Sequence, residues 1–370
     1  MKQVVPIDQV RAGMIVADHV FAPDEDNYLP IIPRHTVLTE YIIGRLWEYG
    51  VVKVAVREPG DPEDETGEEL ELPPIAPMLD EKLRDEAVSG IRRMFDAVGS
   101  GEENMTTAYQ AVREIGEVVD RLVDTLSSES GAFVHIADLK SYDEYTYHHS
   151  LSVAVLSIAI GQNLMLSDGE LRELGRCAML HDIGKTLVPV ELINKPSKLT
   201  DEEFMVIKQH PRKGYDYLKK TSIGDEKLRQ GVLTHHEKLN GAGYPIGLNG
   251  NSIPLMGRII SIADIYDAVT SYRSYRAPMP PGEAIELIKS EIGRAFDYEL
   301  VKAFIEKLEP HPLNTVLELS DGRRGVVIGR TGELRPVLRM LDNGEKLDLM
   351  DRGSLSLVIM KVIDGRGGKY

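Results

Sequence analysis

Seven histidine and aspartate residues in the middle of the chain are of the types that bind divalent metal ions. They are five of the ten histidines and two aspartates: His149, His181, Asp182, His210, His235, His236 and Asp264. Imidazole nitrogen and carboxylate oxygen, without thiolate, suit divalent iron, manganese, zinc or nickel. In the adjacent pair His181-Asp182, the histidine can hold one ion while the carboxylate bridges to a second, at the two-metal spacing of about 3.5–4 Å. Any one of these histidines taken alone is more simply a structural or surface residue, so the metal hypothesis depends on the whole set.

Five short motifs surround these residues in a fixed order. They are Asp143–Ser150, His181–Lys185, His210-Pro211, His235–Glu237 with Asn240–Pro245, and Ala263–Thr270 followed by Arg273 and Tyr275-Arg276. Together they resemble the HD-GYP branch of the HD superfamily of metal-dependent phosphohydrolases. The resemblance covers about residues 128–308, roughly half of the chain. An HD pair alone is a weak signal, whereas all five motifs in order are specific.

The resemblance implies a phosphodiesterase that hydrolyses cyclic di-GMP to linear pGpG, with onward hydrolysis to GMP left open. His149, His181, Asp182 and Asp264 would hold one ion; His210, His235 and His236 would hold the other, with Asp182 as the bridge. We expect two divalent ions, Fe or Mn. A hydroxide that bridges them would attack the phosphorus, because two cations lower the pKa of a bound water.

Asp182 and Lys185 are the expected catalytic residues, and the expected substrate contacts are Lys185, Tyr244, Arg273 and Arg276. A lysine ammonium would stabilise charge on phosphate oxygens as a point cation. A guanidinium donates in a planar fork that fits a second phosphate or a guanine edge. The simpler alternatives are a solvated lysine and two arginines paired at an exposed helix end. Asp267, three residues after Asp264, either supports the site or pairs at the surface.

Two positions depart from the family pattern. Tyr145 stands where some members carry a glutamate that helps to hold a third ion, so two ions are expected rather than three. Asn240 stands where the family usually has aspartate, but the glycines and Tyr244 remain. Adjacent residues on a regular helix point about 100° apart. His235 and His236 can therefore share one ion only if their helix ends or distorts there, which the glycine-rich segment Asn240–Gly243 favours.

The pattern of elements predicts a mainly α protein: an HD-type helical bundle core with a small α/β N-terminal domain and a small β-rich C-terminal appendage. Thr39–Tyr49 is typical of a helix and Val51–Val56 of a strand. Capping boxes at Ser167–Glu170 and Thr200–Glu203 predict two helix starts. Turn signals around Asp321-Gly322 and Asp342–Gly344 separate strand-like runs, among them Gly325–Ile328 and Ser356–Ile359.

These elements divide the chain into five expected parts. Residues 1–57 form the N-terminal domain, 58–78 an acidic and proline-containing linker, and 79–127 connecting helices. Residues 128–308 form the catalytic domain, and 309–370 the C-terminal appendage. The linker follows from eight acidic residues between Glu58 and Glu71, since such a segment has little to bury.

The overall composition limits which cellular compartments and which binding partners are expected. The net charge of -16 disfavours binding to nucleic-acid polymer or to an anionic membrane. Cys177 is the one cysteine, so no intramolecular disulfide can form, which fits a reducing compartment. No apolar run reaches the length of about 18 residues that a membrane span needs. We expect a cytoplasmic protein whose partner is cyclic di-GMP, and leave signalling protein partners and a homodimer open.

Two other functions stay open at this point. One is a signal-binding adaptor that has kept the fold and works by contact with partners. The other is an HD phosphohydrolase that acts on another nucleotide. The occupied ligand positions argue against the first, and the Gly243-Tyr244-Pro245 segment argues against the second.

Overall fold

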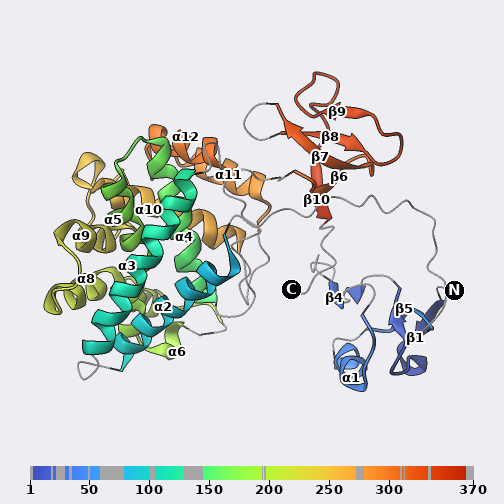
Figure 1. Ribbon diagram of the computed structural model, residues 1–370, viewed down its shortest axis with the longest axis horizontal. Helices are drawn as coiled ribbons and strands as arrows, with labels where there is room; N and C mark the ends of the chain where they lie inside the picture. The colour runs from blue at the N-terminus through green and yellow to red at the C-terminus, as the bar shows by residue number, and fades with distance from the viewer. Residues whose placement is uncertain are drawn as a thin grey trace. The chain divides into compact units, whose positions relative to one another are not determined.

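The computed structural model describes residues 3–17, 20–21, 30–32, 36–48, 51–58, 79–100, 105–128, 145–193, 195, 197–271, 279–308, 311, 313–331 and 335–363 (Figure 1). Two compact units can be distinguished by their internal contacts. One comprises Met1–Pro74, Asn314–Val316 and Lys361–Tyr370; the other comprises Ile75–Leu313 and Leu317–Met360. Within the described residues, no helix is long and apolar enough to cross a membrane.

The N-terminal unit is a small α/β structure, as expected. Strands β1 (Gln3–Pro6), β5 (Lys53–Arg57) and β2 (Ile15–Val16) form an antiparallel sheet in the order β1-β5-β2. The other elements are η1 (Ile7–Gln9), the paired strands β3 (Val20–Phe21) and β4 (Pro30–Ile32), and helix α1 (Glu40–Glu48). Alternate residues of β5, Val54 and Val56, are buried with Leu38 and Leu46, because successive side chains of a strand point to opposite faces.

The second unit holds a helical bundle, which confirms the predicted mainly α fold. Its helices are α2 (Glu81–Gly99), α3 (Met105–Ser128), α4 (Tyr145–Asn163), α5 (Asp168–Leu180), α6 (Val190–Ile193), α7 (Asp201–Ile207), α8 (His210–Lys220), α9 (Glu226–Thr234), α10 (Leu255–Thr270), α11 (Pro281–Ser290) and α12 (Tyr298–Lys307), with short 3-10 turns η4 (Ile183–Leu187) and η5 (Gly250–Ser252). Residues 149–161 of α4 are all buried. A helix that is buried all round lies at the centre of a bundle, and α4 packs against α5, α10 and α12.

Both predicted capping boxes are present. The Ser167 hydroxyl accepts from the Glu170 N–H, while the Glu170 carboxylate accepts from the Ser167 N–H. Thr200 and Glu203 repeat the arrangement at the start of α7. Each cap satisfies amides that have no partner inside the helix and contributes about 1 kcal/mol. The caps define where α5 and α7 begin, and these helices run towards His181 and His210.

The C-terminal strands form one five-stranded sheet in the order β10-β6-β7-β8-β9. The strands are β6 (Val316–Leu319), β7 (Arg324–Arg330), β8 (Pro336–Met340), β9 (Lys346–Asp348) and β10 (Ile359–Ile363). The predicted strand Gly325–Ile328 lies within β7, but the predicted strand Ser356–Ile359 is wrong. Strand β10 begins only at Ile359, because the preceding backbone closes a turn in which the Leu357 N–H donates to the Ser354 carbonyl.

Candidate metal centre

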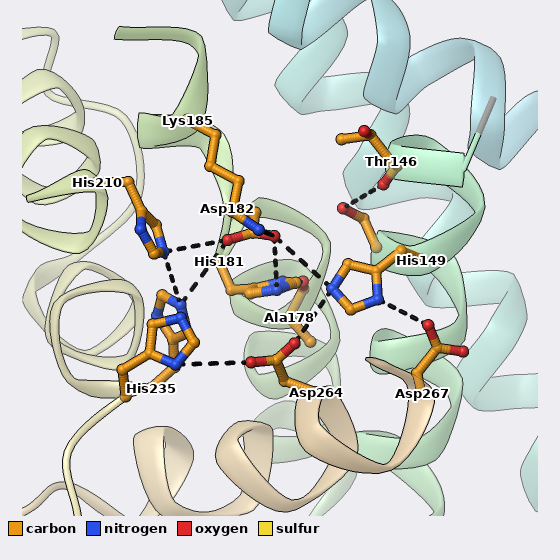
Figure 2. A network of polar contacts seen from close by, with 12 residues as sticks. Thr146, His149, Ala178, His181, Asp182, Lys185, His210, His235, Asp264 and Asp267 are labelled. Atoms are coloured by element: carbon orange, nitrogen blue, oxygen red, sulfur yellow. Dashed lines mark hydrogen bonds and ion pairs between the residues drawn. The ribbon is translucent and has the colours of Figure 1, made fainter. Parts of the chain in front are cut away.

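All seven predicted ligands come together inside the helical unit, and Figure 2 labels each of them except His236. Their ligand atoms fall into two groups, each with its atoms within 4.8 Å of one another: Asp182, His210, His235 and His236 in one, and His149, His181 and Asp264 in the other. Helices α4, α5, α8, α9 and α10 all contribute, so residues more than a hundred positions apart share one buried space.

Helix termini place most of these side chains. His181 caps the C-terminus of α5, and His210 is the first residue of α8. Helix α9 ends at Thr234, with His235 as its cap, so the expected helix end before the glycine-rich segment is confirmed. The rings of His235 and His236 consequently lie side by side, with centroids 4.2 Å apart.

The carboxylate of Asp182 lies between the two groups, as Figure 2 shows. Its Oδ1 is 3.2 Å from His210 Nε2 and 3.9 Å from His235 Nε2. Its Oδ2 is 3.4 Å from His181 Nε2 and 3.7 Å from His149 Nε2. Each oxygen thus faces one group, which is the orientation a bridging ligand requires.

Hydrogen bonds of the outer ring nitrogens determine the histidine tautomers. Nδ1 of His181, His210 and His235 lies 2.7, 2.9 and 2.7 Å from the carbonyl oxygen three residues earlier. A carbonyl can only accept, so each Nδ1 carries the proton and, in the neutral ring, each Nε2 presents its lone pair to the centre.

His149 differs from the other three. The carbonyl three residues before it, that of Thr146, accepts instead from the Ser150 hydroxyl. His149 Nδ1 bonds to the carboxylate of Asp267 on α10 at 2.7 Å, and its Nε2 lies 3.2 Å from Asp264 on the same helix. Asp267 therefore supports His149 from behind, the alternative that the sequence had left open.

Lone pairs that face one another give the centre its chemical character. Nε2 of His210 lies 3.3 Å from Nε2 of His235, because the Nδ1 atom of each ring faces a backbone carbonyl and Nε2 faces the centre. Within the described residues, His181 Nε2 and Asp182 Oδ1 are buried without a hydrogen-bond partner. Buried acceptors at such distances repel one another unless a proton or a cation lies between them. The donor set fits a divalent cation.

Electrostatics keep three of the seven candidate ligands, His235, His236 and Asp182, in the form that binds metal. Burial lowers the pKa of His236 to about 3, against the opposing charge of Asp264, and burial also lowers the pKa of His235 far below its usual value. Burial would raise the pKa of Asp182, but Lys185 and His181 hold that pKa well below its usual value. Two rings are thus neutral and this carboxylate is ionised.

His149 holds its proton more strongly than the other ligands. Burial would lower the pKa of His149, but hydrogen bonds to Asp264 and Asp267, and the charges of these carboxylates, raise it to about 9. Binding of a metal to His149 Nε2 near neutral pH must therefore displace a proton.

Close backbone approach explains two glycines of the motifs. A Cβ on Gly184 would lie 1.9 Å from the His210 carbonyl oxygen, so the start of α8 packs directly on the turn after Asp182. A Cβ on Gly243 would lie 2.4 Å from Glu237 Cα. Both contacts hold ligand-bearing segments together, and any larger residue would force them apart.

Glu237 organises the loop that follows the two adjacent histidines. This buried carboxylate accepts from the N–H groups of Ile246, Gly247 and Leu248 at 2.8 to 3.1 Å. The Tyr244 N–H donates to the His236 carbonyl, and the Tyr244 ring lies 4.6 Å from the His236 ring. This role of Glu237 was not predicted from the sequence; the signal that could have indicated it is an acidic residue just before a glycine-rich segment whose amides need acceptors.

The remaining predicted residues are placed only in part. Lys185 Nζ contacts Asp182 Oδ2, and the lysine side chain is 31% exposed. Tyr145 begins α4, but its side chain lies outside the described residues. Arg273 and Arg276 also lie outside the described residues. Cys177 is buried, and its Sγ donates to the Leu228 carbonyl.

Comparison with known proteins identifies the domain around this centre. The protein family described as "HD domain" matches residues 133–300. "Cyclic di-GMP phosphodiesterase PA4108" of Pseudomonas aeruginosa is 34% identical over 259 residues, which cover 70% of this chain and 62% of that protein. "3'3'-cGAMP-specific phosphodiesterase 3" of Vibrio cholerae is 40% identical over 181 residues, 49% of this chain and 39% of that protein.

A third relative is the "Cyclic di-GMP phosphodiesterase" of Thermotoga maritima, 39% identical over 168 residues, 45% of this chain and 45% of that protein. The chain thus spans between 39% and 62% of the length of these three relatives. The matched segment contains all seven residues of the candidate metal centre and both motifs, HD and GYP. Residues 133–300 therefore match the HD-domain family, and the motifs within them resemble those of its HD-GYP branch.

Proposed function

We propose that this protein is a metal-dependent phosphodiesterase that hydrolyses cyclic di-GMP to linear pGpG. The observation that carries the proposal is the convergence of imidazole and carboxylate acceptors in two groups on either side of Asp182. Two named cyclic di-GMP phosphodiesterases among the relatives support the choice of substrate.

His149, His181 and Asp264 would hold one divalent ion, and His210, His235 and His236 the other, with Asp182 shared between them. We propose Fe or Mn, because the donors are nitrogen and oxygen without thiolate. When bound, a pair of such ions neutralises phosphate charge and lowers the pKa of water at the site.

The residues of the chain orient the substrate and hold charge near it. Lys185 carries its ammonium beside Asp182 with part of its side chain exposed, and would move to a phosphate oxygen where negative charge develops. Tyr244 covers His236 and would contact the nucleotide from the loop. Arg273 and Arg276 stay predicted contacts to a second phosphate or a guanine edge.

The test is incubation of anaerobically purified protein with cyclic di-GMP and Fe²⁺ or Mn²⁺, with products separated by chromatography. The proposal predicts metal-dependent pGpG, and the time course then decides whether GMP follows. Tight binding without product under any metal would favour the adaptor. Hydrolysis confined to nucleoside triphosphates, monophosphates or an alarmone would favour another HD phosphohydrolase.

A second substrate, 3'3'-cGAMP, is favoured by one observation. The Vibrio cholerae relative with that name is 40% identical over the 181 matched residues. Both cyclic dinucleotides present two phosphodiesters and differ in one base, so the metal centre alone does not distinguish them. Competition between the two in one reaction gives the ratio of their kcat/KM values directly.

A further inference from the structure

Lys208 lies at the edge of the metal centre, between two aromatic rings. It caps the C-terminus of α7, two residues before the candidate ligand His210. Its Nζ is 4.7 Å from the ring centroid of Phe204 and 5.4 Å from that of Tyr244. The contact with Phe204 is local to the helix, but the contact with Tyr244 joins α7 to the loop over His236. The two rings hold the ammonium in place by cation–π attraction.

The charge of Lys208 is not neutralised by the surrounding protein. Within the described residues, no carboxylate lies within ion-pair distance of its Nζ, whereas Lys185 contacts Asp182 and Lys195 contacts Glu203 at 2.6 Å. A positioned cation without a carboxylate is available to an anionic ligand.

The position of Lys208 coincides with the opening of the centre. The side chain of His236 is 21% exposed, whereas those of His149, His181, His210 and His235 are at most 3% exposed. Solvent therefore reaches the ligands from the side of His236. Tyr244 lies on that ring, and Lys208 lies next to Tyr244.

We propose that Lys208 is a specificity-determining residue that binds the second, unreactive phosphate of a cyclic dinucleotide. The inference rests on the proposed function, since it assumes a substrate with two phosphates. One phosphate at the metal ions leaves the other at the rim, where a compact ammonium with three donors can reach it. Lys185 beside Asp182 and Lys208 beyond Tyr244 would then each face one phosphate.

The experiment compares Lys208→Met with the wild-type protein and with two further variants. Methionine keeps the apolar stem between the rings and removes the charge; Lys208→Arg keeps the charge. Lys219→Ala is the matched control, because Lys219 also lies over a ring, that of Tyr215 at 5.5 Å, and sits at the far end of α8 from His210. Each protein is assayed for metal content and for hydrolysis of cyclic di-GMP and of bis(p-nitrophenyl) phosphate, a diester with one phosphate.

The proposal predicts that Lys208→Met raises KM for cyclic di-GMP about tenfold or more, the loss expected for one hydrogen bond to a charged group. KM for bis(p-nitrophenyl) phosphate should change by less than about threefold, because this substrate has no second phosphate to lose. The metal content should stay at the wild-type value. Lys208→Arg should restore most of the lost affinity for cyclic di-GMP. KM values for Lys208→Met that match those of Lys219→Ala would overturn it. Equal losses on both substrates would also overturn it, because Lys208 would then act through the metal centre.

Failure of the proposed function can be told apart from failure of this inference. If the metal-loaded wild-type protein hydrolyses neither diester, phosphodiesterase activity is refuted. Calorimetric titration of cyclic di-GMP into the wild-type protein and into Lys208→Met then decides the role of Lys208 on its own. A Kd raised about tenfold or more supports the phosphate contact, and equal Kd values exclude it.

Discussion

Removal of the Asp267 carboxylate should weaken the binding of one metal ion and leave the binding of the other unchanged. Asp267 bonds to His149 Nδ1 at 2.7 Å, and both side chains are buried, at 5% and 3% exposure. The three other ligands with defined tautomers use backbone carbonyls and do not depend on Asp267. The effect should therefore be confined to the ion held by His149, His181 and Asp264.

The magnitude follows from the kind of bond that is lost. A hydrogen bond to a charged group contributes about 1.5–3 kcal/mol, which corresponds to roughly a 10- to 150-fold change in affinity. Loss of the residue that accepts a hydrogen bond from a metal-bound histidine typically lowers metal affinity by about 10- to 100-fold. We expect about tenfold for Asp267→Asn, whose amide oxygen can still accept, and about a hundredfold for Asp267→Ala.

The assay is anaerobic calorimetric titration of Mn²⁺ into metal-free protein at pH 8.5. At this pH the proton on His149, whose pKa is raised to about 9, competes much less with the metal than it does at pH 7. The difference between the proteins should shrink at pH 7, because loss of Asp267 lowers the pKa of His149 and so removes part of the proton competition. Asp216→Ala, at an exposed position of α8, controls for loss of a negative charge. An equal loss of affinity for both ions, or no loss of affinity for either ion, would refute the proposed role of Asp267.

Three further predictions concern other parts of the unit. Asp182→Ala should release both ions, because its two oxygens face both groups; elemental analysis that still finds about two ions per chain would contradict the bridging role. Lys185→Ala should lower kcat much more than metal content, and unchanged turnover would make Lys185 a bystander. Burial and the facing carboxylate of Asp225 raise the pKa of Glu173 to about 7. The folded state thus favours protonated Glu173. This preference stabilises the fold fully below about pH 4.5, and the stabilisation is lost as the pH rises through 7. The melting temperature of Glu173→Gln should rise relative to that of the wild-type protein between pH 5 and pH 8. A difference in melting temperature that stays constant with pH would refute this.

The sequence predicted those helix ends that are fixed by residues adjacent to them in the chain. Helices α5 and α7 begin at the predicted caps because Ser167 and Thr200 can satisfy their free amides. Helix α9 ends before the two adjacent histidines, as the glycine-rich segment indicated. The strand predicted at Ser356–Ile359 was wrong because a β-like composition does not reveal that a turn uses the same backbone.

The ligand set could be predicted, but the contacts that support it could not. The seven residues were recognisable because each stands in a motif of fixed order. The bond between His149 and Asp267 joins residues 118 positions apart, and nothing local distinguishes Asp267 from a surface residue. Glu237 likewise acts on amides nine to eleven residues later, through a loop whose path only the folded chain defines.

The most direct test of the account is anomalous diffraction from crystals of the Mn²⁺-loaded protein. Two peaks are expected, about 3.5–4 Å apart. One peak should contact His149, His181 and Asp264, the other His210, His235 and His236, with Asp182 between them. A single peak, or peaks away from these side chains, would contradict it.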